Sequence, residues 1–127
     1  MKLLERVLKH EGFRSKPYQD HLGVWTIGNG LTYITEAESA EIVEQRLLEL
    51  RRRLWGAHDW LNGQWELTDV LTEMCFQLGW TGCHNFKKMW AALKAGDMAT
   101  AADEALNSKW AKQTPGRALE LSELMRN

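Results

Sequence analysis

Residues 11–32, EGFRSKPYQDHLGVWTIGNGLT, decide the fold of this chain. They continue an apolar run, LLERVLKHEG (3–12), whose spacing predicts a first helix. Two short β-rich runs follow, one at 18–20 and one at 24–27, and a turn that contains Gly23 separates them. The stretch therefore predicts a small β-hairpin attached to the end of a helix.

Two carboxyl groups lie in this stretch in unlike settings. Glu11 ends an apolar helix face, where we expect partial burial to raise the pKa of its carboxyl group. Asp20 borders the turn, where water and free backbone N–H groups keep a carboxylate ionised. One protonated and one ionised carboxyl group are what glycoside hydrolysis requires. Thr26, on the strand after the turn, is placed to hold a water molecule.

Each of these residues also has an ordinary structural interpretation. Taken alone, Glu11 is an exposed helix residue, Asp20 a turn former and Thr26 a strand filler. Their joint placement favours a catalytic role. The glycines of Gly28-Asn29-Gly30 form too short a run for a phosphate loop and no helix follows them, so they indicate backbone geometry near the hairpin.

The stretch resembles the active-site segment of the phage-type lysozymes, the endolysin muramidases of glycoside hydrolase family 24. In that family a Glu at the end of the first helix, an Asp nine residues on and a Thr six further form the catalytic set, and Glu11, Asp20 and Thr26 match it. Further blocks match downstream, at 74–82 (MCFQLGWTG) with Phe86 and at 110–118 (WAKQTPGRA). The matched blocks cover about the first thirty residues and most of the chain after Glu66.

The predicted architecture is α+β and lysozyme-like, in a single domain over 1–127. A small β-hairpin lobe at about 12–35 and a larger helical lobe at about 56–127, to which the N-terminal helix is added, are joined by a long helix at about 36–55. The active-site cleft is expected between the two lobes.

Local signals place the elements after the hairpin. A last short strand is possible at Tyr33-Ile34, and Thr35 with Glu38 forms a capping box that begins the long helix. An apolar stripe at spacings of four, three and four carries that helix to about Trp55; it consists of Val43, Leu47, Leu50 and Leu54. A loop at 56–64 precedes further predicted helices, at about 65–78, 86–93, 98–106 and 115–125, with Asp97 as a cap.

The resemblance also implies roles for residues outside the catalytic set. Gln77 and Trp110 would lie at the sugar site, with Phe76 and Gly30 as further substrate contacts. The Arg that corresponds to Arg117 lies close to the catalytic Glu in the family, where a guanidinium favours the charged carboxylate and opposes the effect of burial. The alternatives are a core position for Phe76 and, for Arg117, a surface ion pair worth under about 1 kcal/mol.

The expected activity is hydrolysis of the β-1,4 bond between N-acetylmuramic acid and N-acetylglucosamine in peptidoglycan. Glu11 would protonate the glycosidic oxygen, while Asp20 would stabilise the oxocarbenium-like transition state and orient the attacking water with Thr26. The resemblance implies inversion at the anomeric carbon, for which carboxyl groups lie about 6.5–9.5 Å apart. No cofactor is expected. No metal is expected either, because no CxxC or HxxxH pair accompanies Cys83-His84.

The chain departs from the family pattern in three places. Leu31 stands where many members carry a His. Only residues 31–34 separate Gly30 from the next predicted helix. The chain also stops at Asn127, without the C-terminal segment of longer members. These differences bear on the subsites at the hairpin and on stability. They leave the catalytic set intact.

Composition limits the class of protein and its partners. In 127 residues, 44% hydrophobic and 26% charged, with a net charge of −1, nothing favours a nucleic-acid partner. The charged N-terminus excludes a signal peptide and membrane insertion, so we expect a protein made in the host cytoplasm. The resemblance to endolysins implies that it needs a holin or similar membrane lesion to reach the wall, and we expect a monomer. Cys75 and Cys83 are expected to be free thiols.

Two other functions fit the same residues. A lytic transglycosylase also uses a catalytic Glu on this polymer, but it forms an anhydro product and needs no second carboxylate, so Asp20 argues against it. A wall-binding module that kept the fold and lost the chemistry is the second alternative, suggested by the short hairpin and Leu31.

Overall fold

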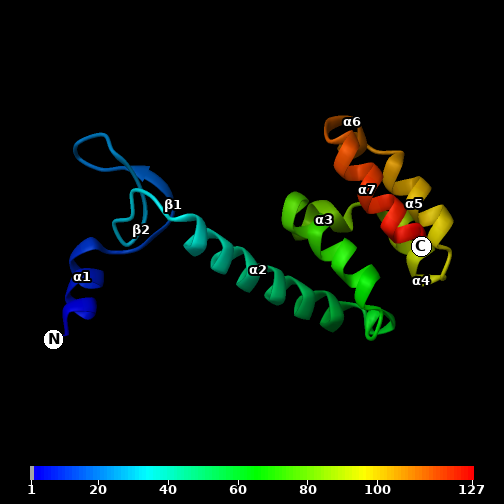
Figure 1. Ribbon diagram of the computed structural model, residues 1–127, viewed down its shortest axis with the longest axis horizontal. Helices are drawn as coiled ribbons and strands as arrows, with labels where there is room; N and C mark the ends of the chain where they lie inside the picture. Colours follow the sequence, from blue (N-terminus) through cyan, green and yellow to red (C-terminus); the bar gives the residue numbers. More distant parts are fainter. Residues whose placement is uncertain (1) are drawn as a thin grey trace. The chain divides into compact units, whose positions relative to one another are not determined.

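The structure, a computed structural model, describes residues 2–127. The chain divides into two compact units, of which the first ends at Ile42 and the second runs Val43–Asn127. The elements of the first unit are drawn in blue to cyan in Figure 1, and those of the second in green to red. Helices make up most of the chain, with one small antiparallel hairpin, which confirms the predicted α+β class.

The first unit contains helix α1 (Leu3–Glu11) and strands β1 (Arg14–Gln19) and β2 (Trp25–Gly28). The strands are antiparallel, with Tyr18 opposite Thr26 and an irregular register toward Arg14. The predicted helix and hairpin are thus confirmed, although β1 begins earlier than the β-rich run. Gly12 lets the chain leave the helix, because its φ of 66° is open to glycine at little steric cost.

The strand predicted at Tyr33-Ile34 is wrong. Leu31 instead turns back on Ile27 in a single bridge, with N–H to O distances of 2.8 and 2.9 Å in the two directions. Because this bridge uses the free edge of β2 and the next helix begins soon afterwards, the sheet of residues 2–127 has only two strands. The apolar pair at 33–34 is exposed.

Helix α2 (Glu36–Ala57) begins with the predicted capping box. Thr35 Oγ1 accepts a hydrogen bond from the N–H of Glu38, and Glu38 Oε1 accepts one from the N–H of Thr35, both at 3.1 Å. The hydrogen bonds from Thr35 also lower the pKa of the Glu38 carboxyl group. Along the apolar stripe Leu54 is fully buried and the other three residues are half-buried, so the predicted helix is confirmed.

The second unit continues with a short 3₁₀ turn and five helices, drawn in green to red in Figure 1. These are η1 (Asp59–Leu61), α3 (Trp65–His84), α4 (Lys87–Lys94), α5 (Met98–Leu106), α6 (Lys109–Gln113) and α7 (Pro115–Arg126). Helix α7 packs against α3, α5 and α6, and α4 packs against α5. The largest side chains of their common core include Leu54, Leu61, Leu71, Met74, Met89 and Leu93.

Two details of this unit differ from the prediction. Helix α3 does not stop at Leu78 but continues to His84 across a kink at Gly79, whose φ of 79° and ψ of 162° are not helical. Helix α6 was not predicted, because its five residues are too few to show a period. Ser108 begins it by accepting a hydrogen bond from the N–H of Ala111, and Asp97 caps α5 as predicted.

Cys75 and Cys83 are buried free thiols. Across residues 2–127, no helix has the combination of length and apolar character that is needed to cross a membrane.

Candidate active site

One pocket of the first unit collects the predicted catalytic residues. Its volume is about 640 Å³. It is lined by Glu11, Arg14, Tyr18, Gln19, Asp20, His21, Thr26, Gly30 and Thr32. Glu11, Asp20, Thr26 and Gly30 therefore come together from the end of α1, the hairpin loop, β2 and the loop after β2.

Asp20 is held by the loop that it caps. Its Oδ1 accepts hydrogen bonds from the N–H groups of Leu22, at 2.8 Å, and Val24, at 2.9 Å. The bond from Val24 is the largest influence that lowers the pKa of the Asp20 carboxyl group, and the bond from Leu22 and the charge of His21 act in the same direction. The side chain is thus a carboxylate at neutral pH with a defined orientation.

Thr26 is the buried member of the set, with 6% of its surface exposed. Its hydroxyl donates to the carbonyl oxygen of Val24 at 3.0 Å. Because the hydroxyl proton is used there, the lone pairs of Oγ1 are left to accept a hydrogen bond from a water molecule. Thr26 can therefore orient such a water as an acceptor.

Glu11 lies against Gly30. A Cβ atom built on Gly30 would lie 2.7 Å from Cδ and 3.0 Å from Cγ of Glu11, well inside contact distance. The carboxyl group of Glu11 thus occupies the space that any other residue at position 30 would need. The partial burial predicted for Glu11 is not found in the structure, where this residue is exposed.

Sequence reasoning missed part of the pocket lining. Tyr18 faces the pocket with Thr26 because residues opposite each other on antiparallel strands share a face of the sheet. The guanidinium carbon of Arg14 lies 4.7 Å from the centre of the Tyr18 ring, so a cation also borders the pocket. The alternation of the strands could have indicated Tyr18. Nothing in the local pattern indicates Arg14, because the register is irregular there.

In the second unit, Gln77 and Trp110 form a hydrogen-bonded pair. The indole Nε1–H of the buried Trp110 donates to Oε1 of Gln77 at 2.9 Å, and Nε2 of Gln77 donates to Oγ1 of Thr114 at 3.4 Å. The amide of Gln77 is therefore held in one orientation. Because only 4% of the Trp110 surface is exposed, this side chain offers little area for direct contact with a ligand.

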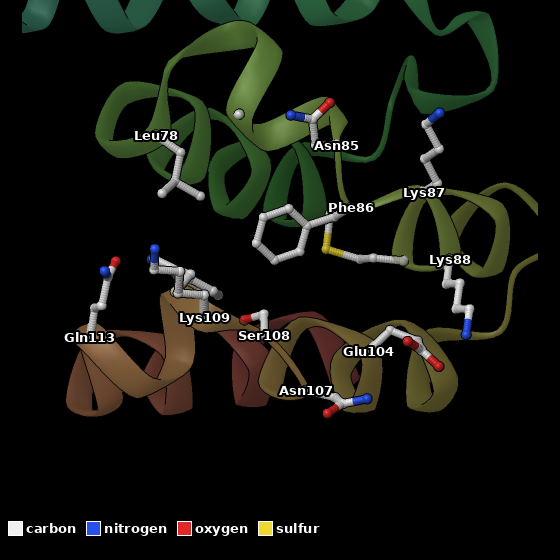
Figure 2. Close-up of a pocket in the computed structure, with 13 residues that line it drawn as sticks. Leu78, Asn85, Phe86, Lys87, Lys88, Glu104, Asn107, Ser108, Lys109 and Gln113 are labelled. Atoms are coloured by element: carbon white, nitrogen blue, oxygen red, sulfur yellow. The ribbon is translucent and has the colours of Figure 1, made fainter.

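Trp110 also borders a larger pocket of the second unit, of about 660 Å³. Figure 2 shows the Phe86 ring in the middle of this pocket, with Leu78 beside it and with Ser108 and Lys109 on the facing wall. The Phe86 and Trp110 rings meet edge to face, with centroids 6.0 Å apart. An aromatic floor and a rim that carries lysines and amides form a concave surface with both apolar and polar groups.

Phe76 and Arg117 lie in different surroundings within this unit. Phe76 is 43% exposed, so the core position considered above is not found, and it lines a pocket of about 360 Å³ between residues of α2 and α3. Arg117 forms an ion pair with Glu73, with Nε and Oε2 2.8 Å apart. Both side chains of this pair are partly exposed.

Among residues 2–127, no group of three or more His, Cys, Asp or Glu side chains is arranged to hold a metal ion.

A family model with the description "Phage lysozyme" matches residues 8–126. The chain is also similar to the pre-baseplate central spike protein Gp5 of Enterobacteria phage T4, with 27% identity over 152 aligned positions. This match covers 93% of the chain and 26% of the relative, so the chain spans about a quarter of the length of that protein.

Proposed function

The chain belongs to the phage lysozyme family, whose members are glycosidases of the lysozyme type, and we propose that it hydrolyses the β-1,4 bond between N-acetylmuramic acid and N-acetylglucosamine in bacterial peptidoglycan. The observation that carries the proposal is the common pocket of Glu11, Asp20 and Thr26. Two carboxyl groups and a hydroxyl that can hold water, around one cavity, suit glycoside hydrolysis.

In this mechanism the two carboxyl groups have different tasks. Glu11 is the general acid, which protonates the glycosidic oxygen as the bond breaks. Asp20 stabilises the positive charge that develops on the sugar ring and, with Thr26, orients the attacking water. The hydrogen bonds to Asp20 support its part, because they lower the pKa of its carboxyl group and keep it ionised.

Inversion at the anomeric carbon is part of the proposal. It requires a separation of about 6.5–9.5 Å between the two carboxyl groups, so that a water fits beneath the sugar. NMR of the freshly cleaved glycan tests this point, because an inverting enzyme releases the α-anomer first from a β-linked substrate. Initial release of the β-anomer would indicate retention and a covalent intermediate instead.

The remaining predicted residues act on substrate binding and positioning. Gly30 leaves room for the Glu11 carboxyl group and gives the sugar access to it. Gln77 and the exposed Phe76 contact the glycan, and the buried Trp110 acts through Gln77, which it holds by a hydrogen bond. By the resemblance, Arg117 acts on the ionisation of Glu11, because a guanidinium favours the charged carboxylate. These roles come from the resemblance and from the contacts within the second unit.

The main test is the loss of turbidity of chloroform-treated Gram-negative cells. The unaltered protein should clear them, and Glu11→Gln should not, because an amide cannot serve as the general acid. Glu5→Gln, at the other end of the same helix and outside the pocket, is the matched control and should clear them normally. Equal clearing by Glu11→Gln and the unaltered protein would remove Glu11 from the mechanism, and no clearing by any of them would favour a binding module.

Mass spectrometry of the released muropeptides separates hydrolysis from transglycosylation. Hydrolysis adds one water across the bond, whereas a lytic transglycosylase leaves an anhydro end that is lighter by one water. We expect hydrated products, since Asp20 and Thr26 lie in the pocket beside Glu11.

The biological setting of the enzyme is proposed in two forms. In the first it is an endolysin, a monomer made in the host cytoplasm that reaches the peptidoglycan through a holin lesion and lyses the cell. In the second it is the wall-cutting part of a baseplate spike, a possibility favoured by the similarity to the central spike protein. Mass spectrometry of purified virions decides between them, because an endolysin is absent from the particle and a spike component is present.

A further inference from the structure

One side chain of the hairpin, that of Asn29, is hydrogen-bonded to the end of α1. Nδ2 of Asn29 donates to the carbonyl oxygen of Gly12 at 2.6 Å and lies 3.5 Å from that of Leu8. These two carbonyl groups belong to the C-terminal end of the helix, where backbone oxygens run short of partners within the helix. The oxygen of Leu8 already accepts the N–H of Gly12 at 3.0 Å, so Gly12 is the main acceptor for the Asn29 amide. Within the part of the chain that the structure describes, no other side chain makes a hydrogen bond between this helix and the hairpin.

Apolar packing adds no fully buried side chain of α1 to this connection. None of the described residues of α1 is buried, and its apolar side chains, Leu3, Leu4, Val7 and Leu8, are all at least 42% exposed. The helix end is therefore located by the amide of Asn29 and by the contact of Glu11 with Gly30.

Glu11 lies in the turn of helix that Asn29 holds. It stands between Leu8 and Gly12, the two residues whose oxygens face the amide, and its carboxyl group rests on Gly30, the neighbour of Asn29. Gly12 and Gly30 both have positive φ, so the chain turns sharply on either side of this contact. The hydrogen bond from Asn29 and the close approach of Glu11 to Gly30 together set the position of the Glu11 carboxyl group relative to β2.

We propose that Asn29 is a positioning residue for Glu11, which fastens the C-terminal turn of α1 to the end of β2 and so places the general acid over the pocket. The inference rests on the proposed function. Asn29 touches no reacting atom in this scheme and does not line the pocket, so its effect is exerted through the helix end. What Asn29 contributes is a side-chain N–H donor, which an apolar residue or an ionised Asp of similar size cannot supply.

The test compares variants at this position on purified peptidoglycan, with reducing ends as the measure of cleavage. Asn29→Leu keeps the approximate size and removes the donor, and we expect kcat to fall by about 10- to 100-fold, since a misplacement of about 1 Å can cost that much. The apparent KM should change little, because the binding residues are intact. Asn29→Asp, which has the same shape and no donor when ionised, should behave like Asn29→Leu, and it serves if the leucine variant does not fold.

Rescue by a conservative change separates positioning from general stability. Asn29→Gln keeps an amide donor and should retain more of kcat than Asn29→Leu at equal folded fraction. Asn62→Leu, in the loop after η1, is the control for removal of an Asn side chain and should leave kcat unchanged. An unchanged kcat in Asn29→Leu, or an equal loss in Asn29→Gln and Asn29→Leu, would overturn the inference.

Failure of the proposed function is distinguishable from failure of this inference. If the unaltered protein releases no reducing ends, hydrolysis is wrong, and the inference then depends on NMR hydrogen exchange of the Asn29 side-chain amide. Protection of that amide supports the connection to Gly12, and its absence contradicts it.

Discussion

The carboxyl group of Glu11 occupies the space beside Gly30 in which a side chain at position 30 would begin, since a Cβ on Gly30 would lie 2.7 Å from Cδ of Glu11. Contact this close leaves no room for any side chain at position 30. The carboxyl group of Glu11, the proposed general acid, thus lies close to the turn that follows β2, although Glu11 itself is exposed at the end of its helix.

The first prediction concerns this contact. Gly30→Ala should lower kcat by about 100-fold, because the added methyl group must displace the Glu11 carboxyl group. The control is Gly23→Ala in the hairpin loop, where φ is 80° but nothing lies within 4 Å of the added Cβ. Both changes strain the backbone by about 1–3 kcal/mol, so both should lower the unfolding temperature. Equal activities of the two variants would show that the Gly30 contact is not needed.

The second prediction concerns the loop that Asp20 closes. The pKa of Asp20 is lowered chiefly by the hydrogen bond from Val24, so the folded loop favours the carboxylate. The resulting stabilisation is present above the ordinary pKa of 3.8 and is lost as the pH falls through the lowered value. Hydrogen exchange of the Leu22 and Val24 amides should show protection at neutral pH that disappears in acid.

Asp20→Asn provides the matched variant for this loop. It retains an acceptor oxygen for both amides but loses the charge, so it should keep the protection in acid while losing hydrolysis. Loss of protection at neutral pH in this variant would mean that charge, rather than the acceptor, holds the loop.

A third prediction concerns a pair of histidines in the second unit. Nε2 of His58 lies 2.9 Å from Nε2 of His84, the two rings are within 8° of parallel, and the Trp90 ring is stacked on both, with centroids 4.5 and 4.6 Å away. Nδ1 of His84 lies 2.7 Å from the carbonyl oxygen of Trp80 and must carry a proton to bond it. In the neutral pair, Nε2–H of His58 therefore donates to His84.

Folding makes His58 harder to protonate than it is in the unfolded chain. Burial is the main cause that lowers the pKa of His58, and the charges of His84 and Lys94 lower it further. The stabilisation is therefore present above the ordinary pKa of 6.5 and is lost as the pH falls from there to the lowered value. Urea unfolding between about pH 5 and pH 8 should show that the free energy of unfolding decreases as the solution becomes more acidic. The decrease should be smaller in His58→Phe, because no proton is taken up at this position. Identical pH dependence of the two proteins would contradict this explanation.

The fourth prediction separates two roles of Arg117. Its ion pair with Glu73 is partly exposed on both sides, so a double-mutant cycle should give a coupling free energy below about 1 kcal/mol. If Arg117 acts on the ionisation of Glu11, Arg117→Gln should shift the pH profile of kcat, whereas Glu73→Gln, which breaks the same ion pair, should leave that profile unchanged. Equal effects of the two changes on the profile would assign the effect to the ion pair.

Predictions from local signals were the accurate ones. The capping box of Thr35 and Glu38, the cap at Asp97 and the hairpin around Gly23 were all confirmed, because each depends on residues a few positions apart. The strand at 33–34 was wrong, since its apolar pair had no free sheet edge nearby once Leu31 bridged to Ile27. The continuation of α3 beyond Gly79 was also missed, because a glycine signals a break and not whether a helix resumes after it.

The sequence by itself determined the family and the candidate catalytic residues, because residue type and spacing within residues 11–32 carry that information. It also predicted the first helix, the hairpin and the long helix that follows. Only the tertiary structure decided that the Asn29 amide donates to Gly12, that the Glu11 carboxyl group lies beside Gly30 and that the rings of His58 and His84 come within hydrogen-bond distance. The physical reason is that hydrogen bonds and close contacts between distant positions depend on how the backbone turns, to within a few tenths of an ångström. No local propensity specifies positions that closely.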